Sequence, residues 1–217
     1  MRRNPLKTIV VTSSRADWGY LSVPVGLMRS DNAFDLAVVA TGQHLDTQSG
    51  ETIAVVEKES GPVAARVAMT QSGDTALDIT RAMSEGLTGF GEVFAALQPD
   101  IILLLGDRYE ILAAACAGLM ARIPMAHMAG GDVSEGAIDD AIRHAITKLA
   151  HLHFPTNTEA AERIVRMGED PARIHCVGST GLDLLLKVKI MERDAFFEAI
   201  GHAPQQRTLL VTMHPVT

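Results

Sequence analysis

Several acidic residues come soon after apolar runs of the sequence, where they could act as catalytic acids or bases. Asp107 and Arg108 follow the wholly apolar run 101–105, and Asp132 follows residues 123–128 and a pair of glycines. An acid at the end of such a run is well placed to accept or deliver a proton. It is also well placed to cap the helix that follows, so the sequence around Asp107 leaves both interpretations open.

A second charged group lies farther along, where Asp139, Asp140, Arg143 and His144 fall within one predicted helix. Residues four apart share a helix face, so Asp139 faces Arg143 and Asp140 faces His144. Such pairs can simply stabilise the helix by a few tenths of a kcal/mol each. They can also gather carboxylates and cations around one substrate. The preceding glycines keep this second interpretation open, because they permit close backbone approach to a ligand.

The first apolar run ends in Ser13, Ser14 and Arg15, ahead of a helical pattern. The glycine-rich fingerprint of a dinucleotide site is missing from this loop. Hydroxyls, helix N-terminal amides and a guanidinium can still hold a phosphate. The alternative is a serine that caps the helix beside a surface arginine.

Short β-branched or aliphatic runs alternate with longer helical patterns. Strands are predicted at residues 8–12, 36–41, 101–105, 123–128, 151–154 and 174–177, and helices at 108–120, 139–150 and 158–167. A start signal for the last helix lies at residues 156–159 (TNTE), and a stop signal lies at Gly168. This alternation predicts an α/β fold with a doubly wound, Rossmann-like parallel sheet. Ligands in such folds lie beyond the carboxyl ends of the strands, where the residues described above are placed.

The last residues predict the start of another domain. After a polar break that begins at Pro204, residues 208–211 form a new apolar run. A lone parallel strand without a partner would be a poor end to a domain. We therefore expect a Rossmann-like domain over residues 1–203 and the opening of a second, truncated domain over residues 204–217.

Composition argues against several classes of partner. The 217 residues are 47% hydrophobic and carry a formal net charge of −7, so we expect no binding to nucleic acid or to a membrane. The most apolar stretch, 101–128, is interrupted by charged residues and a proline, unlike a membrane span. Two isolated cysteines fit a reduced, cytoplasmic protein. His151 and His153 could face one side of a strand, but no third metal ligand follows at a recognisable spacing.

Several short motifs together resemble one enzyme family. They are TSSR at 12–15, TGQH at 41–44, GDRYE at 106–110, GGD at 130–132, DD at 139–140, RHAITK at 143–148 and TMHP at 212–215. In this order they resemble the hydrolysing UDP-N-acetylglucosamine 2-epimerases of sialic-acid and legionaminic-acid biosynthesis. The resemblance covers nearly the whole chain. Each motif is weak alone, and the combination is specific.

The resemblance implies a two-domain fold of the glycosyltransferase-B type, with a UDP-sugar between the domains and this chain as the N-terminal half. It implies a homo-oligomer when the protein is full length, and it requires no cofactor. The catalytic residues that it implies are Asp107, Asp139 and His214, and Asp132 is a further catalytic candidate. The substrate-binding residues that it implies are Arg15, Gln43, His44, Arg108, Asp140, Arg143 and His144.

One position departs from the family pattern. Many relatives carry a glutamate, taken as catalytic, where this chain has Ala129. Asp132, three residues on, could supply the missing carboxylate. The departure also leaves room for a modified substrate, such as a 2,4-diacetamido sugar.

The implied reaction expels UDP from carbon 1 and removes the proton from carbon 2, which gives a glycal. Water then adds to the double bond, and a proton returns to the opposite face of carbon 2. Such a scheme needs two acid/base groups and cations beside the leaving diphosphate. The alternatives are a non-hydrolysing 2-epimerase, a glycosyltransferase on the same architecture, and a catalytically silent sugar-nucleotide-binding domain. We expect the 217-residue chain to be inactive without its C-terminal domain.

Overall fold

The computed structural model describes residues 4–47, 50, 52–70, 73, 75–134, 136–204 and 207–212. The strands are β1 Leu6–Thr12, β2 Phe34–Thr41, β3 Ala65–Val67, β4 Ile101–Leu105, β5 Met125–Met128 and β6 Leu152–Phe154. The α-helices are α1 Arg15–Ser30, α2 Ile53–Ser60, α3 Ala76–Leu97, α4 Tyr109–Met120, α5 Ile138–Leu149, α6 Thr158–Arg166, α7 Thr180–Lys187 and α8 Arg193–Ala199. Short 3-10 turns lie at η1 Gly42–Leu45 and η3 Pro171–Arg173.

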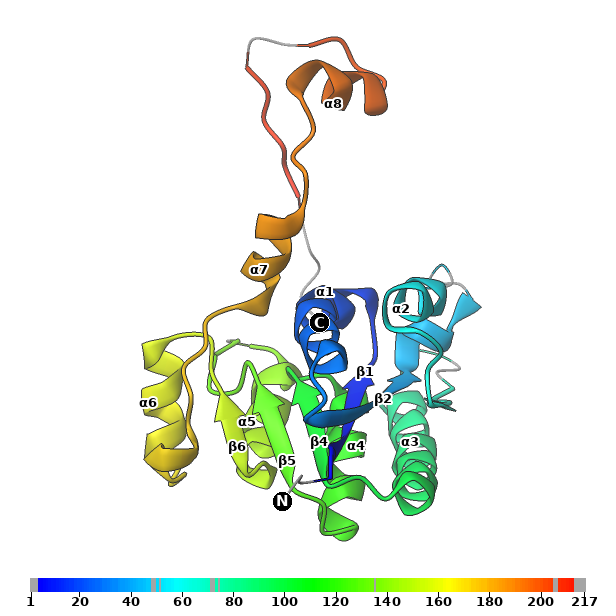
Figure 1. The fold of residues 1–217 in the computed structure, drawn as a ribbon, viewed down its shortest axis with the longest axis vertical. Coiled ribbons are helices and arrows are strands. Elements are labelled where there is room, and N and C mark those ends of the chain that lie inside the picture. Colours follow the sequence, from blue (N-terminus) through cyan, green and yellow to red (C-terminus); the bar gives the residue numbers. More distant parts are fainter. Residues whose placement is uncertain are drawn as a thin grey trace.

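The strands form one parallel sheet in the order β3-β2-β1-β4-β5-β6. From β1 the chain first builds outward to β3, and then returns to place β4 on the other side of β1 (Figure 1). The register pairs Thr8 with Ile101 and Val10 with Leu103. This reversal beside β1 is the topological switch point at which doubly wound sheets bind ligands.

Helices cover both faces of the sheet, and each face has its own hydrophobic core. On one face, Ile102 and Leu104 of β4 pack with Phe90 of α3, Ile111 of α4 and Ile146 of α5. The opposite face buries residues of α1, α2 and the strands: Val10, Trp18, Leu21, Val56 and Leu103. A strand covered on both faces must be apolar throughout, which explains the uninterrupted sequence of β4.

Side-chain caps fix where several helices begin. Ser14 accepts a hydrogen bond from the backbone of Asp17, which confirms the capping interpretation of this serine. Asn157 caps α6 by accepting from the Ala160 backbone at 2.8 Å, as its start signal predicts. A cap satisfies backbone donors that the first helical turn leaves unpaired. These caps therefore fix where α1 and α6 begin, shortly after β1 and β6.

The predicted α/β fold is confirmed, and two predicted strands are wrong. Residues 174–177 run beside β6 but form only one isolated bridge, between Ile174 and His153, because Pro155 ends β6 after three residues. Residues 208–211 form no strand. Leu209 and Leu210 are 92% and 91% exposed, with no strand of the described chain beside them to accept their hydrogen bonds. The domain boundary at residues 203–204 stays a prediction.

The C-terminal part of the described chain leaves the sheet. α7 packs against α1, and α8 lies beyond α7, away from the strands (Figure 1). Apolar side chains stay exposed here, including Leu185 and Leu186. Within the described ranges, no helix combines the length and the apolar character that crossing a membrane requires.

Candidate active site

The carboxyl end of β4 and the first half of α5 meet in a part-buried ion pair. Asp107 follows β4, and its carboxylate accepts a hydrogen bond from Nη2 of Arg143. The same nitrogen donates to Oγ of Ser134 at 2.9 Å, and Nη1 donates to the carbonyl oxygen of Asp132 at 3.0 Å. Burial lowers the pKa of Arg143, although an arginine keeps its charge in proteins. One guanidinium therefore joins the segments that follow β4 and β5.

Asp132 is held from the other side by the residues that follow β6. Its two carboxylate oxygens accept hydrogen bonds from Thr156 Oγ1 and Asn157 Nδ2, each at 3.0 Å. The turn that leads to it is tight, because Ala129 adopts a φ of +58°. A non-glycine residue in this left-handed region costs about 1–3 kcal/mol and is common at functional sites. The carboxylate of Asp132 is thus fixed at the same end of the sheet as Asp107.

The charged residues of α5 surround this ion pair. Asp140 lies 3.6 Å from Nη1 of Arg143, and it also accepts from the Ser134 backbone at 2.9 Å. His144 Nε2 lies 3.7 Å from the Asp140 carboxylate, so the pairing predicted from four-residue spacing is confirmed. Asp139 is half-buried in the first turn of the same helix. The predicted helix therefore brings its acids and cations to the edge where β4 and β5 end.

A second polar group lies where β1 and β2 end. His44 is buried, with Nε2 2.9 Å from Thr12 Oγ1 and Nδ1 3.0 Å from Thr52 Oγ1. Burial lowers the pKa of His44, with a smaller opposing effect from Asp17. Asp17 in turn accepts a hydrogen bond from the hydroxyl of Ser13. This network ties the loops after β1 and β2 to each other.

Arg108 is fixed by a carboxylate that the sequence reasoning did not assign. Nε and Nη2 of Arg108 donate to the two oxygens of Glu110, at 3.1 and 2.7 Å. Glu110 is fully buried, whereas the Arg108 side chain stays about one-third exposed (32%). The guanidinium therefore keeps an open side at the carboxyl end of β4, and a fork held in this way suits a phosphate or carboxylate.

Besides His44, Arg108 and Asp139, which are described above, the predicted site residues fall into three groups. Asp107, Asp132, Asp140, Arg143 and His144 share one connected network. Arg15 and Gln43 are exposed on the loops after β1 and β2. His214 lies outside the described residues.

Several site residues were missed by sequence reasoning. Glu110 bonds Arg108, and Ser134 and Thr147 bond Arg143. Asp17 accepts from Ser13 in the loop after β1, and the buried His127 contacts Thr147. The contacts of Ser134 and His127 join separate segments, so spacing could not reveal them. The partners of Asp17, Glu110 and Thr147 lie two to four residues away, and Glu110 gave a further signal as an acid in the first turn of a helix that is otherwise apolar.

His151 and His153 do not form a shared face on a strand. His151 lies just before β6 and accepts from the Met125 backbone, whereas His153 lies 3.3 Å from Glu169. Among the residues that the structure describes, no group of three or more His, Cys, Asp or Glu side chains is placed to hold a metal ion.

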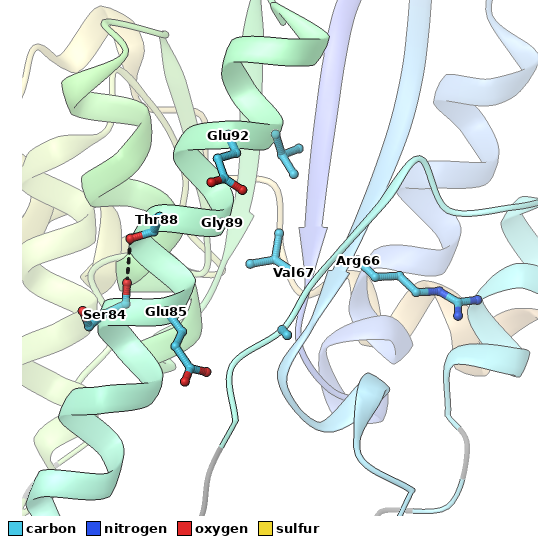
Figure 2. Close-up of a pocket in the computed structure, with 9 residues that line it drawn as sticks. Arg66, Val67, Ser84, Glu85, Thr88, Gly89 and Glu92 are labelled. Atoms are coloured by element: carbon cyan, nitrogen blue, oxygen red, sulfur yellow. Dashed lines mark hydrogen bonds between the residues drawn. The ribbon is translucent and has the colours of Figure 1, made fainter.

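An open cleft of about 540 Å³ lies elsewhere, between the edge strand β3 and helix α3 (Figure 2). Glu85 and Glu92 line it, and Arg66 pairs with Glu57 of α2 at 2.7 Å. Figure 2 shows the Arg66 side chain pointing away from α3. Among the described residues that line the cleft, two are acidic and the one cation is paired, which suits an anionic nucleotide poorly, so the carboxyl end of the sheet is the better candidate.

Known proteins resemble this chain in sequence. The family model described as UDP-N-acetylglucosamine 2-epimerase matches residues 27–217. The UDP-N,N'-diacetylbacillosamine 2-epimerase (hydrolyzing) of Legionella pneumophila is 36% identical over 97% of this chain and 55% of its own length. The GDP/UDP-N,N'-diacetylbacillosamine 2-epimerase (hydrolyzing) of Campylobacter jejuni is 31% identical over 97% and 55%. The chain thus spans about half the length of these relatives.

Solved structures share the fold. The UDP-GlcNAc 2-epimerase of Neisseria meningitidis, bound to UDP-GlcNAc, has a TM-score of 0.73 at 19% identity, over 84% of this chain and 49% of that one. The Methanocaldococcus jannaschii enzyme, in complex with UDP-GlcNAc and UDP, has a TM-score of 0.75 at 20% identity, over 90% and 54%. The family match and the Legionella relative settle the classification that the motifs predict: the chain belongs to the UDP-N-acetylglucosamine 2-epimerase family.

Proposed function

We propose that the protein containing this chain is a hydrolysing 2-epimerase, which converts a UDP-N-acetylglucosamine-type sugar to UDP and the free 2-epimer. A 2,4-diacetamido sugar is the favoured substrate, because two similar proteins are named as hydrolysing diacetylbacillosamine 2-epimerases. Since the chain spans about half the length of these relatives, the activity of the whole protein is part of the proposal.

The observation that carries the proposal is the pair of carboxylate residues fixed by one buried guanidinium. Arg143 donates both to the Asp107 carboxylate and to the backbone of Asp132. The reaction needs one group to take the proton from carbon 2 and another to return a proton on the opposite face. Asp107 and Asp132 fill these two roles in our proposal, and Asp139 is the third acid/base candidate.

The bond changes fit these groups. The C2–H electron pair becomes the C1=C2 double bond as the C1–O bond breaks, and UDP leaves with the electrons of that bond. Water then adds its oxygen at carbon 1, and carbon 2 receives a proton on the opposite face. The scheme uses no metal or redox group.

Cations must stabilise the departing diphosphate. Arg108 and the exposed Arg15 are the proposed phosphate contacts on this chain, together with His144 and His214. Asp140 orients His144 and Arg143 through the contacts described above. Gln43 is a proposed sugar contact, and His44 supports its loop because both ring nitrogens already have protein partners.

Chromatography of the reaction products tests the proposal. The full-length protein would be incubated with UDP-N-acetylglucosamine and, separately, with its UDP-2,4-diacetamido analogue. We expect free UDP and a free manno-configured sugar, with the diacetamido substrate turned over faster. A UDP-linked epimer would instead identify a non-hydrolysing epimerase. Binding without any product would identify a silent nucleotide-sugar-binding domain.

We also propose that residues 1–217 alone do not turn over a nucleotide sugar, because the relatives are about twice as long. The same assay on the 217-residue chain and on the full-length protein compares the two directly. Equal turnover by both would refute this part of the proposal.

A further inference from the structure

His127 contacts the segments of the chain that carry the residues of the proposed site. It is fully buried in β5, and its Nε2 lies 2.8 Å from the carbonyl oxygen of Gly106. Its Nδ1 lies 3.2 Å from Oγ1 of Thr147. Gly106 immediately precedes Asp107, and Thr147 lies one helical turn after Arg143. The imidazole therefore touches both elements that carry the Asp107–Arg143 ion pair.

The partners of His127 determine where its proton resides. A carbonyl oxygen can only accept, so Nε2 must carry the hydrogen and donate it to Gly106. Nδ1 of the neutral ring then carries a lone pair. The Thr147 hydroxyl lies between this lone pair and the carbonyl oxygen of Arg143, and its Oγ1 is 2.9 Å from that oxygen. The single hydroxyl proton is therefore shared between the two acceptors. Burial lowers the pKa of His127 to about 4, which keeps the ring neutral near pH 7.

The turn that leads to Asp132 also packs against this network. A Cβ atom added to Gly130 would lie 2.8 Å from both His127 Nδ1 and Thr147 Oγ1. Such distances leave no room for a side chain, so the backbone of the turn rests directly on the imidazole and the hydroxyl. Three segments, which carry Asp107, Asp132 and Arg143, thus meet around His127.

We infer that His127 is a positioning residue, which holds Asp107, Asp132 and Arg143 at their mutual spacing and exchanges no proton with the substrate. Its ring is enclosed, and both nitrogens are already engaged by Gly106 and Thr147. The effect on turnover rests on the proposed epimerase function. The hydrogen-bond network itself can be tested without it.

Two substitutions separate the contacts of His127, because the amide nitrogen of glutamine can reach the place of Nε2 and that of asparagine the place of Nδ1. In the full-length protein we expect His127→Gln to retain kcat within about 5-fold, and His127→Asn to lose at least about 10-fold with KM little changed. The shape of the pH–rate profile should be unchanged in both variants. The matched control is His153→Gln. His153 lies in β6 directly beside His127 in the sheet register, and it is buried to the same extent. Its kcat should stay close to that of the natural protein.

Three other results of these assays would count against the inference. Loss of one limb of the pH–rate profile in His127→Gln would make His127 an acid or base. Equal loss in the His153→Gln control would reduce the effect to general destabilisation. Full activity of His127→Asn would remove the positioning role.

Nitrogen-15 NMR of the histidine rings tests the network without relying on turnover. We expect a protonated Nε2 and an unprotonated Nδ1 for His127, unchanged from about pH 7.5 down to about pH 5.5. A protonated Nδ1 in that range would overturn the inference. If the natural protein turned over neither sugar, the proposed function would fail while this spectrum still tested the network.

Discussion

Arg143 of α5 and Asp107 at the end of β4 form an ion pair with one buried and one open partner. The Arg143 side chain is 7% exposed, whereas the Asp107 side chain is 25% exposed. The guanidinium therefore holds the carboxylate from behind, and the carboxylate keeps a free side at the carboxyl end of the sheet. Parallel sheets bind ligands at this end, so the ion pair presents Asp107 where a substrate would lie.

Replacement of Arg143 should disable the site. Lysine carries its donors on one nitrogen and cannot replace the two separated nitrogens that serve Asp132 on one side and Asp107 and Ser134 on the other. We therefore expect Arg143→Lys to lower kcat/KM by at least about 100-fold. Steady-state kinetics of the full-length protein measure the effect. The matched control is Arg166→Lys, which changes an exposed arginine of α6 in a surface ion pair with Glu162. Near-natural activity of Arg143→Lys would contradict the role assigned to this residue.

A side chain added at Gly42 should destabilise the fold. It has a φ of +55°, and an added Cβ would lie 2.8 Å from Glu110 Oε1 and 3.1 Å from the Ser13 carbonyl oxygen. We expect Gly42→Ala to lower the free energy of unfolding by about 1–3 kcal/mol, because it adds backbone strain and displaces the carboxylate that holds Arg108. Urea unfolding measures the change.

The control for that substitution is Gly26→Ala in α1, where an added Cβ meets nothing within 4 Å. Alanine is the better helix former, so this variant should be more stable by about 0.5–1 kcal/mol. If both glycine variants changed stability by the same amount, the close contact between Gly42 and Glu110 would have no energetic role.

Stability should fall as the pH drops below about 6.5. Burial lowers the pKa of His127 from 6.5 to about 4, so between these values the unfolded chain binds a proton that the folded chain does not. Unfolding is then favoured by added protons, and His127 alone should cost up to roughly 3 kcal/mol by the lower end of this window. The pKa values of His44 and His153 are also lowered, mainly by burial, and act in the same direction.

Urea unfolding at about pH 7.5 and about pH 5 measures this dependence. His127→Gln should weaken it, because glutamine does not titrate. A stability that stayed constant or rose on acidification would contradict the neutral, buried state of these histidines.

Much of the architecture could be predicted from the sequence, because its strongest signals are local. The apolar run of β4 is typical of a strand covered on both faces, and the periodicity of α5 gave its limits nearly to the residue. Segments 174–177 and 208–211 were wrongly predicted as strands. Strand formation depends on a neighbour that accepts hydrogen bonds, and an apolar run does not reveal whether one exists.

In the candidate site, too, the local contacts could be predicted and the contacts between distant segments could not. The pairing of Asp140 with His144 follows from helix spacing and could be predicted. The partners of Arg143 come from the segments after β4 and β5, which only the folded sheet brings together. Glu110 was passed over because its importance lies in its complete burial beside Arg108. His127 was passed over because its hydrogen bonds to Gly106 and Thr147 form only in the folded sheet.

Proton NMR of the full-length protein in D2O tests the central claim most directly. The substrates would be UDP-N-acetylglucosamine and its 2,4-diacetamido analogue, each followed from mixing to completion. We predict free UDP together with a manno-configured sugar that carries deuterium at carbon 2, because the returning proton comes from solvent. Release of UDP with the original proton and configuration at carbon 2, or no exchange and no product from either sugar, would contradict an epimerase site at the carboxyl end of this sheet.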